Sequence, residues 1–254
     1  MTSASPWLPF GAGNGTGVRL LCLPHAGAGA STYRAWGAGL PAGITACPVQ
    51  PPGREGRLWH PPYRHVTPMV ADLATELREL LDSPYAIFGH SMGALVAFEL
   101  AREFRRRGWP APAHLFVAGR HAPQQPFTLT ELRDIGTEDL TRLLGELGGT
   151  PPALLADPEL LESIAPLLRA DFSVNETYRY TEEPPLDVPI TAFAATADPR
   201  ATPAQLAAWR AQTSRGFATH LLPGGHFAVL QHASFVQARM AEAVAPLAAS
   251  RGVA

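Results

Sequence analysis

One serine stands in a pattern that is typical of an activated nucleophile. Ser91 lies between Gly89 and Gly93 in the stretch IFGHSMGALVAFELA, which begins at residue 87. The apolar residues before it are typical of the end of a buried strand, and those after it recur at helical spacing. A strand that turns abruptly into a helix needs small residues beside the turn, which the glycines supply. Such a turn lifts the serine hydroxyl above the sheet edge, so Ser91 is the predicted nucleophile.

A serine hydroxyl needs a base to take its proton, and nine histidines compete for this role. His226 lies in the short loop PGGHF at residues 223–227, after the last predicted strand and before the C-terminal helix. The loop lies at the carboxyl edge of a parallel sheet, where Ser91 also emerges. The side chain of His90 should diverge from that of Ser91 in a sharp turn, and the other histidines fall in loops or beside regular elements. His226 is therefore the predicted general base.

A carboxylate must orient the histidine and stabilise its cation. Asp198, in AATADPRATP at residues 194–203, is the only acid between the preceding predicted strand and His226. An Asp-Pro pair is also common in ordinary turns, which is the competing interpretation. The chain order Ser91, Asp198, His226 is that of the α/β-hydrolases and differs from the orders of trypsin-like and subtilisin-like enzymes.

Two backbone N–H groups are needed to stabilise the negative charge that develops on the attacked carbonyl oxygen. Met92 directly follows the nucleophile at the predicted helix start and is the first predicted donor. The second donor is predicted in the loop after the first strand, PHAGAGAS at residues 24–31, where small residues let the backbone approach a ligand. Ala26 is the predicted donor there, and a merely flexible glycine loop is the competing interpretation.

Short apolar segments alternate with helical segments along most of this chain of 254 residues. The predicted strands are 18–23, 44–49, 85–88, 114–119, 189–195 and 218–222. The predicted helices are 69–81, the segment that follows Ser91, 203–212 and 227–247. This alternation predicts an α/β fold, with a mostly parallel sheet that helices cover on both faces.

One region interrupts the alternation. Residues 121–185 contain no convincing strand but two helical stretches, 137–147 and 157–170, with proline pairs between and after them. We interpret this region as a helical insertion above the sheet, in the position of a lid. No internal repeat or linker divides the chain, so residues 1–254 are predicted to form a single domain that includes the insertion.

Composition excludes several classes of function. A net charge of −2 gives no indication of nucleic-acid binding or of an anionic membrane surface, and no segment approaches the length of a membrane span. The N-terminus lacks the pattern of a signal peptide, so Cys22 and Cys47 are predicted to be buried free thiols of a cytoplasmic protein. The histidines lack ligand spacing and the cysteines form no C-x-x-C pair, so no metal site and no cofactor are predicted.

Six motifs spread over nearly the whole chain give it a family resemblance. They are LPHAGAG (23–29), QPPGREGR (50–57), FGHSMGA (88–94), GTPPALLADPELL (149–161), LRADF (168–172) and PGGHF (223–227). With these motifs the chain resembles the type II thioesterases, the stand-alone editing hydrolases of polyketide and nonribosomal peptide synthases. It is also similar to the medium-chain thioesterase that works beside animal fatty acid synthase.

The resemblance implies an α/β-hydrolase fold and a mobile helical lid at 121–185. It assigns the nucleophile, acid, base and two oxyanion donors to Ser91, Asp198, His226, Ala26 and Met92. It also implies a partner, an acyl or peptidyl carrier protein whose phosphopantetheine arm carries the acyl thioester. This chain departs from the family pattern before the acid, where AATA replaces the usual glycine-rich turn.

The sequence also allows other interpretations of the function. A carboxylesterase or acyltransferase for small molecules could use the same fold, because a fold does not fix the substrate. A carrier-binding protein without activity is a third interpretation, against which the complete triad argues. The run Arg105-Arg106-Arg107 could dock an acidic carrier protein, but basic residues at a helix end also complement the helix dipole, which is the favoured interpretation. Arg54 and Arg57 are predicted to be structural.

Overall fold

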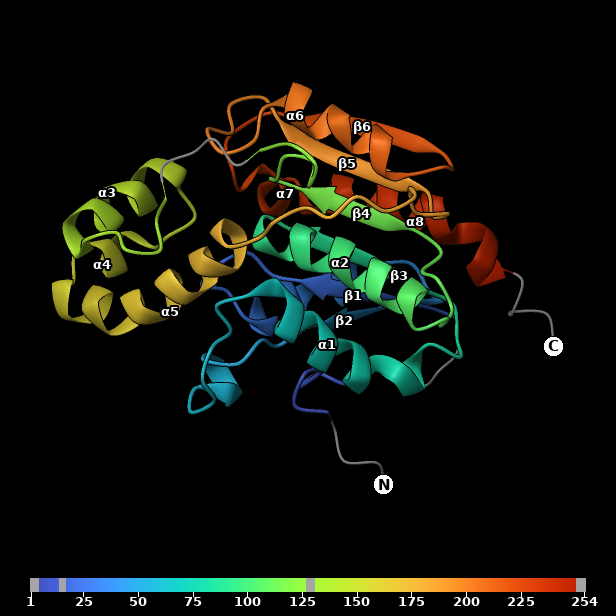
Figure 1. Ribbon diagram of the computed structural model, residues 1–254, viewed down its shortest axis with the longest axis horizontal. Helices are drawn as coiled ribbons and strands as arrows, with labels where there is room; N and C mark the ends of the chain where they lie inside the picture. Colours follow the sequence, from blue (N-terminus) through green and yellow to red (C-terminus); the bar gives the residue numbers. More distant parts are fainter. Residues whose placement is uncertain (1–4, 14–16, 127–130, 250–254) are drawn as a thin grey trace.

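Six parallel strands form the centre of the molecule. In the computed structural model, which describes residues 5–13, 17–126 and 131–249, they are β1 (Val18–Leu23), β2 (Ile44–Pro48), β3 (Tyr85–His90), β4 (Leu115–Ala118), β5 (Ile190–Ala195) and β6 (Phe217–Leu222). Their order is β2-β1-β3-β4-β5-β6, and every adjacent pair is parallel. The predicted α/β class is therefore confirmed, and the strand that leads to Ser91 lies inside the sheet (Figure 1).

Helices cover both faces of the sheet. On one face lie α1 (Val66–Leu77), α2 (Met92–Arg106), α6 (Pro203–Ala207) and the 3-10 helix η4 (Ala208–Gln212); on the other lie the 3-10 helix η1 (Ala30–Gly39), α7 (Ala228–Gln231) and α8 (Ala233–Ala249). Successive side chains of β1 alternate between the two cores, as the pleat requires. Leu21 and Leu23 pack in the first core, and Leu20 and Cys22 pack in the second.

Several predicted helices are divided or shifted. The predicted helix 69–81 is α1 followed by the 3-10 turn η3 (Arg78–Leu80), and it begins at Val66, which places Pro68 in the first turn, where proline is tolerated. The helix predicted at 203–212 changes from α6 to η4. It starts at a capping box formed by Thr202 and Gln205. A further 3-10 turn, η2 (Glu55–Arg57), lies between β2 and α1.

Three helices follow one another in the insertion between β4 and β5. They are α3 (Thr137–Leu147), α4 (Pro152–Leu155) and α5 (Pro158–Glu176). Helices α3 and α4 lie beside the sheet and away from its other helices, and α5 leads back to α2 (Figure 1). Both predicted helices are present, but α5 runs on to Glu176 and α4 was not predicted. The side chain of Asp157 caps α5 by accepting the N–H of Leu160, at 3.0 Å, and Pro158 occupies the first helical position.

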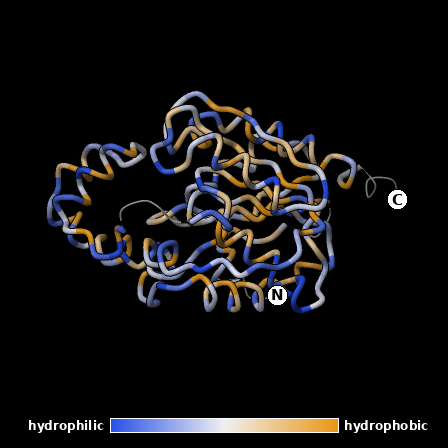
Figure 2. Tube along the Cα trace, turned by 45° about the horizontal axis from the view of Figure 1, so that its top comes forward, coloured by the Kyte–Doolittle hydropathy of each residue, from blue (hydrophilic) through white to orange (hydrophobic). Residues whose placement is uncertain are grey.

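The insertion has a small apolar core of its own. Leu132, Leu140, Ala165, Leu168 and Phe172 are buried together, and Ala26 of the loop after β1 packs against them. Figure 2 shows hydrophilic and hydrophobic residues alternating along this part of the trace, as expected for amphipathic helices with one packed side. The insertion is thus joined to the rest of the protein at the loop that was predicted to donate an oxyanion hydrogen bond. Its movement as a lid stays a prediction.

The two cysteines are buried and free, as predicted. Burial raises the pKa of the Cys47 thiol to about 12 and the pKa of the Cys22 thiol well above its ordinary value, so both stay protonated near neutral pH. Among the described residues, no helix is both long and apolar enough to cross a membrane.

Candidate active site

The turn at Ser91 depends on two glycines that lie against other backbone. Ser91 joins β3 to α2 with φ 55° and ψ −114°, a left-handed conformation that non-glycine residues rarely adopt. A Cβ atom on Gly89 would lie 2.1 Å from the carbonyl oxygen of Gly93. A Cβ atom on Gly93 would lie 2.2 Å from the carbonyl oxygen of Leu23. Both positions therefore require glycine, which accounts for the G-x-S-x-G pattern.

His226 and Asp198 form a buried pair. The Nδ1 atom of His226 lies 2.9 Å and 3.0 Å from the two carboxylate oxygens of Asp198, and each side chain belongs to a residue that is only 6% exposed. Oδ1 of Asp198 also accepts the backbone N–H of Arg200 at 2.8 Å, which fixes the carboxylate. With Nδ1–H donating to Asp198, the other ring nitrogen of His226 is the one free to accept a proton.

Three of the five predicted site residues line one pocket. Ser91, His226 and Ala26 all line it, and Ser91 is anchored by its backbone N–H, which donates to the carbonyl of Ala118 at 2.8 Å. Asp198 lies behind His226, and Met92 is the buried first residue of α2, directly after Ser91. Met92 therefore adjoins the nucleophile from the start of α2, and Ala26 lines the same pocket from the loop after β1; their role as oxyanion donors stays a prediction.

Two further histidines pack beside His226. The rings of His90 and His226 are 5.0 Å apart, and the Nε2 atom of His90 lies 2.9 Å from the backbone oxygen of His226. Burial, together with the nearby His226, lowers the pKa of His25 to about 3 and the pKa of His90 well below its ordinary value. Both rings are neutral near pH 7, so neither places a second positive charge beside the catalytic candidate.

The pocket has an apolar wall and a polar end. Leu144 and Leu147 of α3 and Leu168 and Phe172 of α5 form the apolar wall, so the insertion covers the nucleophile. The polar end contains Arg120, Asn175, Glu176 and Arg200. No sequence motif indicated this polar group. Its members come from the end of β4, from α5 and from the loop after β5.

A buried ion pair connects the insertion to the loop that carries Ala26. The guanidinium of Arg54 donates to both carboxylate oxygens of Asp171 on α5, at 2.6 and 2.8 Å. The same carboxylate accepts the backbone N–H of Gly27 at 2.7 Å, and Arg54 donates to the carbonyl of Ala28 at 3.1 Å. The structural role predicted for Arg54 fits these contacts. Asp171 was missed as a site residue, although the motifs LRADF and PGREGR contain both partners.

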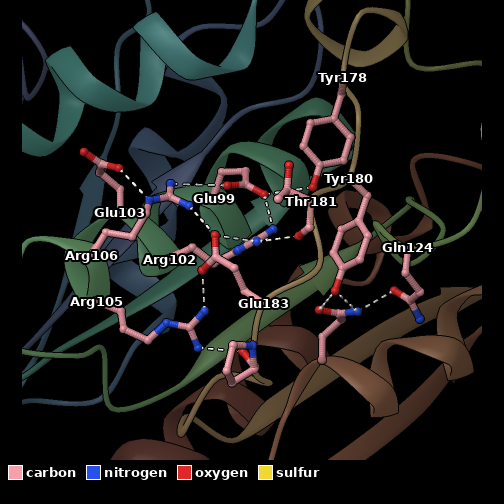
Figure 3. Close-up of polar contacts among 12 residues, drawn as sticks. Glu99, Arg102, Glu103, Arg105, Arg106, Gln124, Tyr178, Tyr180, Thr181 and Glu183 are labelled. Atoms are coloured by element: carbon pink, nitrogen blue, oxygen red, sulfur yellow. Dashed lines mark hydrogen bonds and ion pairs between the residues drawn. The ribbon is translucent and has the colours of Figure 1, made fainter.

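The arginine run at the end of α2 lies in a cluster of ion pairs on another part of the molecule. Arg105 and Arg106 both contact Glu183, at 2.6 and 2.8 Å, and the buried Arg102 contacts the same carboxylate at 2.6 Å (Figure 3). Burial alone would raise the pKa of Glu183, but the hydrogen bonds from Arg102 and Arg105 lower it to about 2. The charges of this run are therefore balanced within the chain, which favours a structural role over a docking patch.

No group of three metal-ligating side chains occurs in the described parts of the chain. The groups gathered beside Ser91 are a histidine, a carboxylate and backbone N–H groups, which are the parts of an acid–base and nucleophilic centre. A buried His–Asp pair beside a serine in a strand-to-helix turn is an arrangement suited to acyl transfer.

Comparisons with known proteins agree with this chemistry. A family model described as "Thioesterase domain" matches residues 18–244. The chain is 43% identical over 210 residues to the gramicidin S biosynthesis protein GrsT of Aneurinibacillus migulanus, a match that covers 83% of this chain and 82% of that protein.

Solved structures of thioesterases are also similar to this chain. The RedJ thioesterase from the prodiginine pathway of Streptomyces coelicolor superposes with a TM-score of 0.84 at 39% identity, over 89% of this chain and 90% of that chain. A serine-to-alanine mutant of YbtT, a type II thioesterase from the yersiniabactin NRPS/PKS pathway, superposes with a TM-score of 0.83 at 33% identity, over 93% of this chain and 96% of that chain.

Proposed function

This chain belongs to the thioesterase family, in the type II group that serves nonribosomal peptide and polyketide synthases, and we propose that it removes acyl groups from carrier proteins by hydrolysing their thioesters. The observation that carries the proposal is the buried His226–Asp198 pair, whose histidine lines the same pocket as Ser91. Both the family membership and the geometry of the site thus support the predicted thioesterase activity.

In the first half of the reaction, His226 takes the proton of Ser91 as the serine oxygen attacks the thioester carbonyl. Asp198 holds the imidazole in the correct tautomer and stabilises its cation. The backbone N–H groups of Ala26 and Met92 donate to the oxyanion. Hydrogen bonds of this kind contribute about 3–4 kcal/mol each to lowering the barrier. The carbon–sulfur bond then breaks, and the thiol leaves with the proton from His226.

In the second half, water replaces the thiol. His226 takes a proton from the water, the hydroxide attacks the acyl–Ser91 ester, and the free acid leaves while the proton returns to Ser91. Burial lowers the pKa of His25 and of His90, so both rings are weak bases, whereas the ring of His226 bonds to a carboxylate that can stabilise its cation. No cofactor enters either step.

The acyl group is proposed to arrive on the phosphopantetheine arm of an acyl or peptidyl carrier protein. The apolar wall from α3 and α5 suits an acyl chain, and the insertion above Ser91 excludes water while the ester forms. We place the reaction in the cytoplasm, which fits the two buried free thiols.

The first test measures acid release from one carrier protein loaded in turn with acetyl, butyryl, octanoyl and a longer β-keto chain. We expect wild-type protein to release these acids and Ser91→Ala to release them at least about 10⁴-fold more slowly, because the nucleophile is gone. The profile over chain length measures the room beside the apolar wall.

If no acid is released, labelling with a fluorophosphonate distinguishes between the possible causes. If wild-type protein is labelled at Ser91 but cleaves no carrier-bound thioester, the site is that of an esterase or acyltransferase for small molecules. If folded wild-type protein is not labelled, Ser91 is not an activated nucleophile and the proposed mechanism is wrong.

A further inference from the structure

The polar end of the catalytic pocket contains a buried arginine whose charge has no carboxylate partner among the described residues. Arg120 is 6% exposed, and the side-chain contact that fixes it is a hydrogen bond from Nη1 to the amide oxygen of Asn175 at 2.5 Å. Its Nε–H has no hydrogen-bond partner in the part of the chain that the structure describes. Burial lowers the pKa of the guanidinium to about 10, so it is still charged near neutral pH. A buried charge without a partner is costly, and proteins rarely retain one without a use.

The backbone holds Arg120 close to the catalytic candidates. Arg120 directly follows Gly119, where a Cβ atom would lie 2.9 Å from the His90 ring and 3.2 Å from the His226 ring. On the other side, the indole N–H of Trp209 donates to the carbonyl of Arg120 at 2.9 Å. The backbone at these two residues thus lies against the imidazole of His226 at Gly119 and bonds to the indole of Trp209 at Arg120.

The side chain of Arg120 borders two cavities. Arg120 and Asn175 line the catalytic pocket and also a second cavity of about 380 Å³, so they stand between the two. The walls of the second cavity are largely polar, with side chains such as Gln124, Gln125 and Tyr180. Gln124 and Tyr180 already hydrogen-bond to other parts of the protein, so the donor in this wall that a ligand oxygen could satisfy is the Nε–H of Arg120.

Arg200 also lines the pocket, but its charge is compensated differently. Burial lowers the pKa of both guanidinium groups, but the carboxylates of Glu176 and Asp198 favour the charged form of Arg200, whereas Arg120 receives no such carboxylate support and is repelled by Arg200. Arg120 is therefore the side chain of this pair that a ligand oxygen would satisfy.

We propose that Arg120 binds an oxygen acceptor carried by the acyl chain, a carboxylate or a keto oxygen, so that the enzyme prefers oxygenated acyl groups to saturated ones of similar size. The inference rests on the proposed function and names the substrate class of the same site. The chemistry is unchanged: water adds to the acyl carbon, the carbon–sulfur bond breaks, and the bound oxygen acceptor leaves intact with the acid. An Nε–H and a charged guanidinium match such an acceptor in both geometry and charge.

The test compares kcat/KM for malonyl, 3-oxobutanoyl and butyryl thioesters on one carrier protein, in wild type, Arg120→Gln and Arg120→Lys. We expect the ratio of each oxygenated substrate to butyryl to fall about 10- to 100-fold in Arg120→Gln, the range for loss of a hydrogen bond to a charged group. Arg120→Lys keeps the charge and should retain more of the ratio for malonyl than for 3-oxobutanoyl. The matched control is Arg215→Gln, which removes an exposed arginine that pairs with Asp187 outside the pocket.

A second measurement does not depend on whether Arg120 variants fold. It is the affinity of acylated carrier proteins for the inactive variant Ser91→Ala. Malonyl- and 3-oxobutanoyl-carrier protein should bind this inactive protein at least about tenfold more tightly than butyryl-carrier protein. Equal affinities, or an unchanged substrate ratio in folded Arg120→Gln, would overturn the role of Arg120 and leave the thioesterase function standing. If wild-type protein cleaves none of the three thioesters, the proposed function itself fails.

Discussion

At the scale of single residues, Asp198 controls which nitrogen of His226 can act as the base. Its two oxygens lie within 3.0 Å of Nδ1, so the proton of the neutral imidazole is held on that atom. The backbone N–H of Arg200 holds the carboxylate from the other side. A side chain of the same shape but without the acceptor charge should therefore leave the fold intact and harm only the chemistry.

Asp198→Asn should lower kcat for thioester hydrolysis by about 10⁴-fold, because an amide stabilises the wrong tautomer and cannot stabilise the imidazolium. The measurement is single-turnover acid release, with circular dichroism to verify the fold. Asp187→Asn is the matched control, since Asp187 is exposed and pairs with Arg215. A decrease of less than about tenfold in Asp198→Asn would show that another acid orients His226.

At the scale of elements, the contact between α5 and the loop after β1 connects the cover of the pocket to its oxyanion donor. Asp171 of α5 is 2% exposed and binds both Arg54 and the N–H of Gly27, the residue after Ala26. Gly27 has φ +80°, and a Cβ atom there would lie 2.6 Å from Leu168 of α5, so the loop and the helix fit closely. The position of Ala26 therefore depends on a helix that is far away in sequence.

Asp171→Asn should lower the free energy of unfolding by about 3–5 kcal/mol, because it leaves the buried Arg54 charge without its partner. It should also lower kcat, since the Gly27 N–H loses a charged acceptor. Urea denaturation and acid release give the two quantities. The double variant Arg54→Met/Asp171→Leu separates the effect on stability from the effect on kcat. We expect this variant to regain the free energy of unfolding that Asp171→Asn loses, but not the kcat. Recovery of both would mean that the network is structural and does not position the loop.

The sequence predicted most of this fold and the centre of the site because those features have local causes. Ser91 and His226 each stand beside glycines at the end of a strand, and the alternation of apolar segments is visible residue by residue. Asp171 and Arg120 were not predicted, since their roles arise from contacts between segments that are 50 or more residues apart: Asp171 lies 117 residues from Arg54, and Arg120 lies 55 from Asn175. Helix ends such as that of α5 depend equally on tertiary packing.

At the scale of the whole molecule, buried neutral histidines connect stability to pH. Burial lowers the pKa of His114 and His121 to about 4 and that of His25 to about 3. In the unfolded chain these groups titrate near 6.5, so between about pH 4 and 6.5 the unfolded state binds more protons than the folded state. The free energy of unfolding should therefore fall as the pH decreases through this window and be fully restored above it.

The variant His114→Gln tests the predicted pH dependence of stability. His114 lies outside the catalytic pocket, and its Nε2 atom lies 2.8 Å from the hydroxyl of Thr191. Between pH 4.5 and 6, each such histidine contributes a slope of up to about 1.4 kcal/mol per pH unit. The variant should show a slope that is smaller by up to this amount in urea denaturation at several pH values. His60→Gln, an exposed change, should leave the slope as in wild type. Equal slopes in wild type and His114→Gln would contradict the prediction.

The ion pairs of Glu183 have a mechanical consequence for the insertion. Glu183 lies in the segment between α5 and β5, and three arginines of α2 hold it against the same helix that begins at the nucleophile. If the insertion moves as a lid, this end is the pivot, and displacement under a rigid rotation grows with distance from the pivot. The far end at α4 would travel further than Asp171, which lies on α5, the last helix before the pivot. The pocket could then widen at its outer rim to admit a substrate while the backbone around Ala26 keeps its support throughout the cycle.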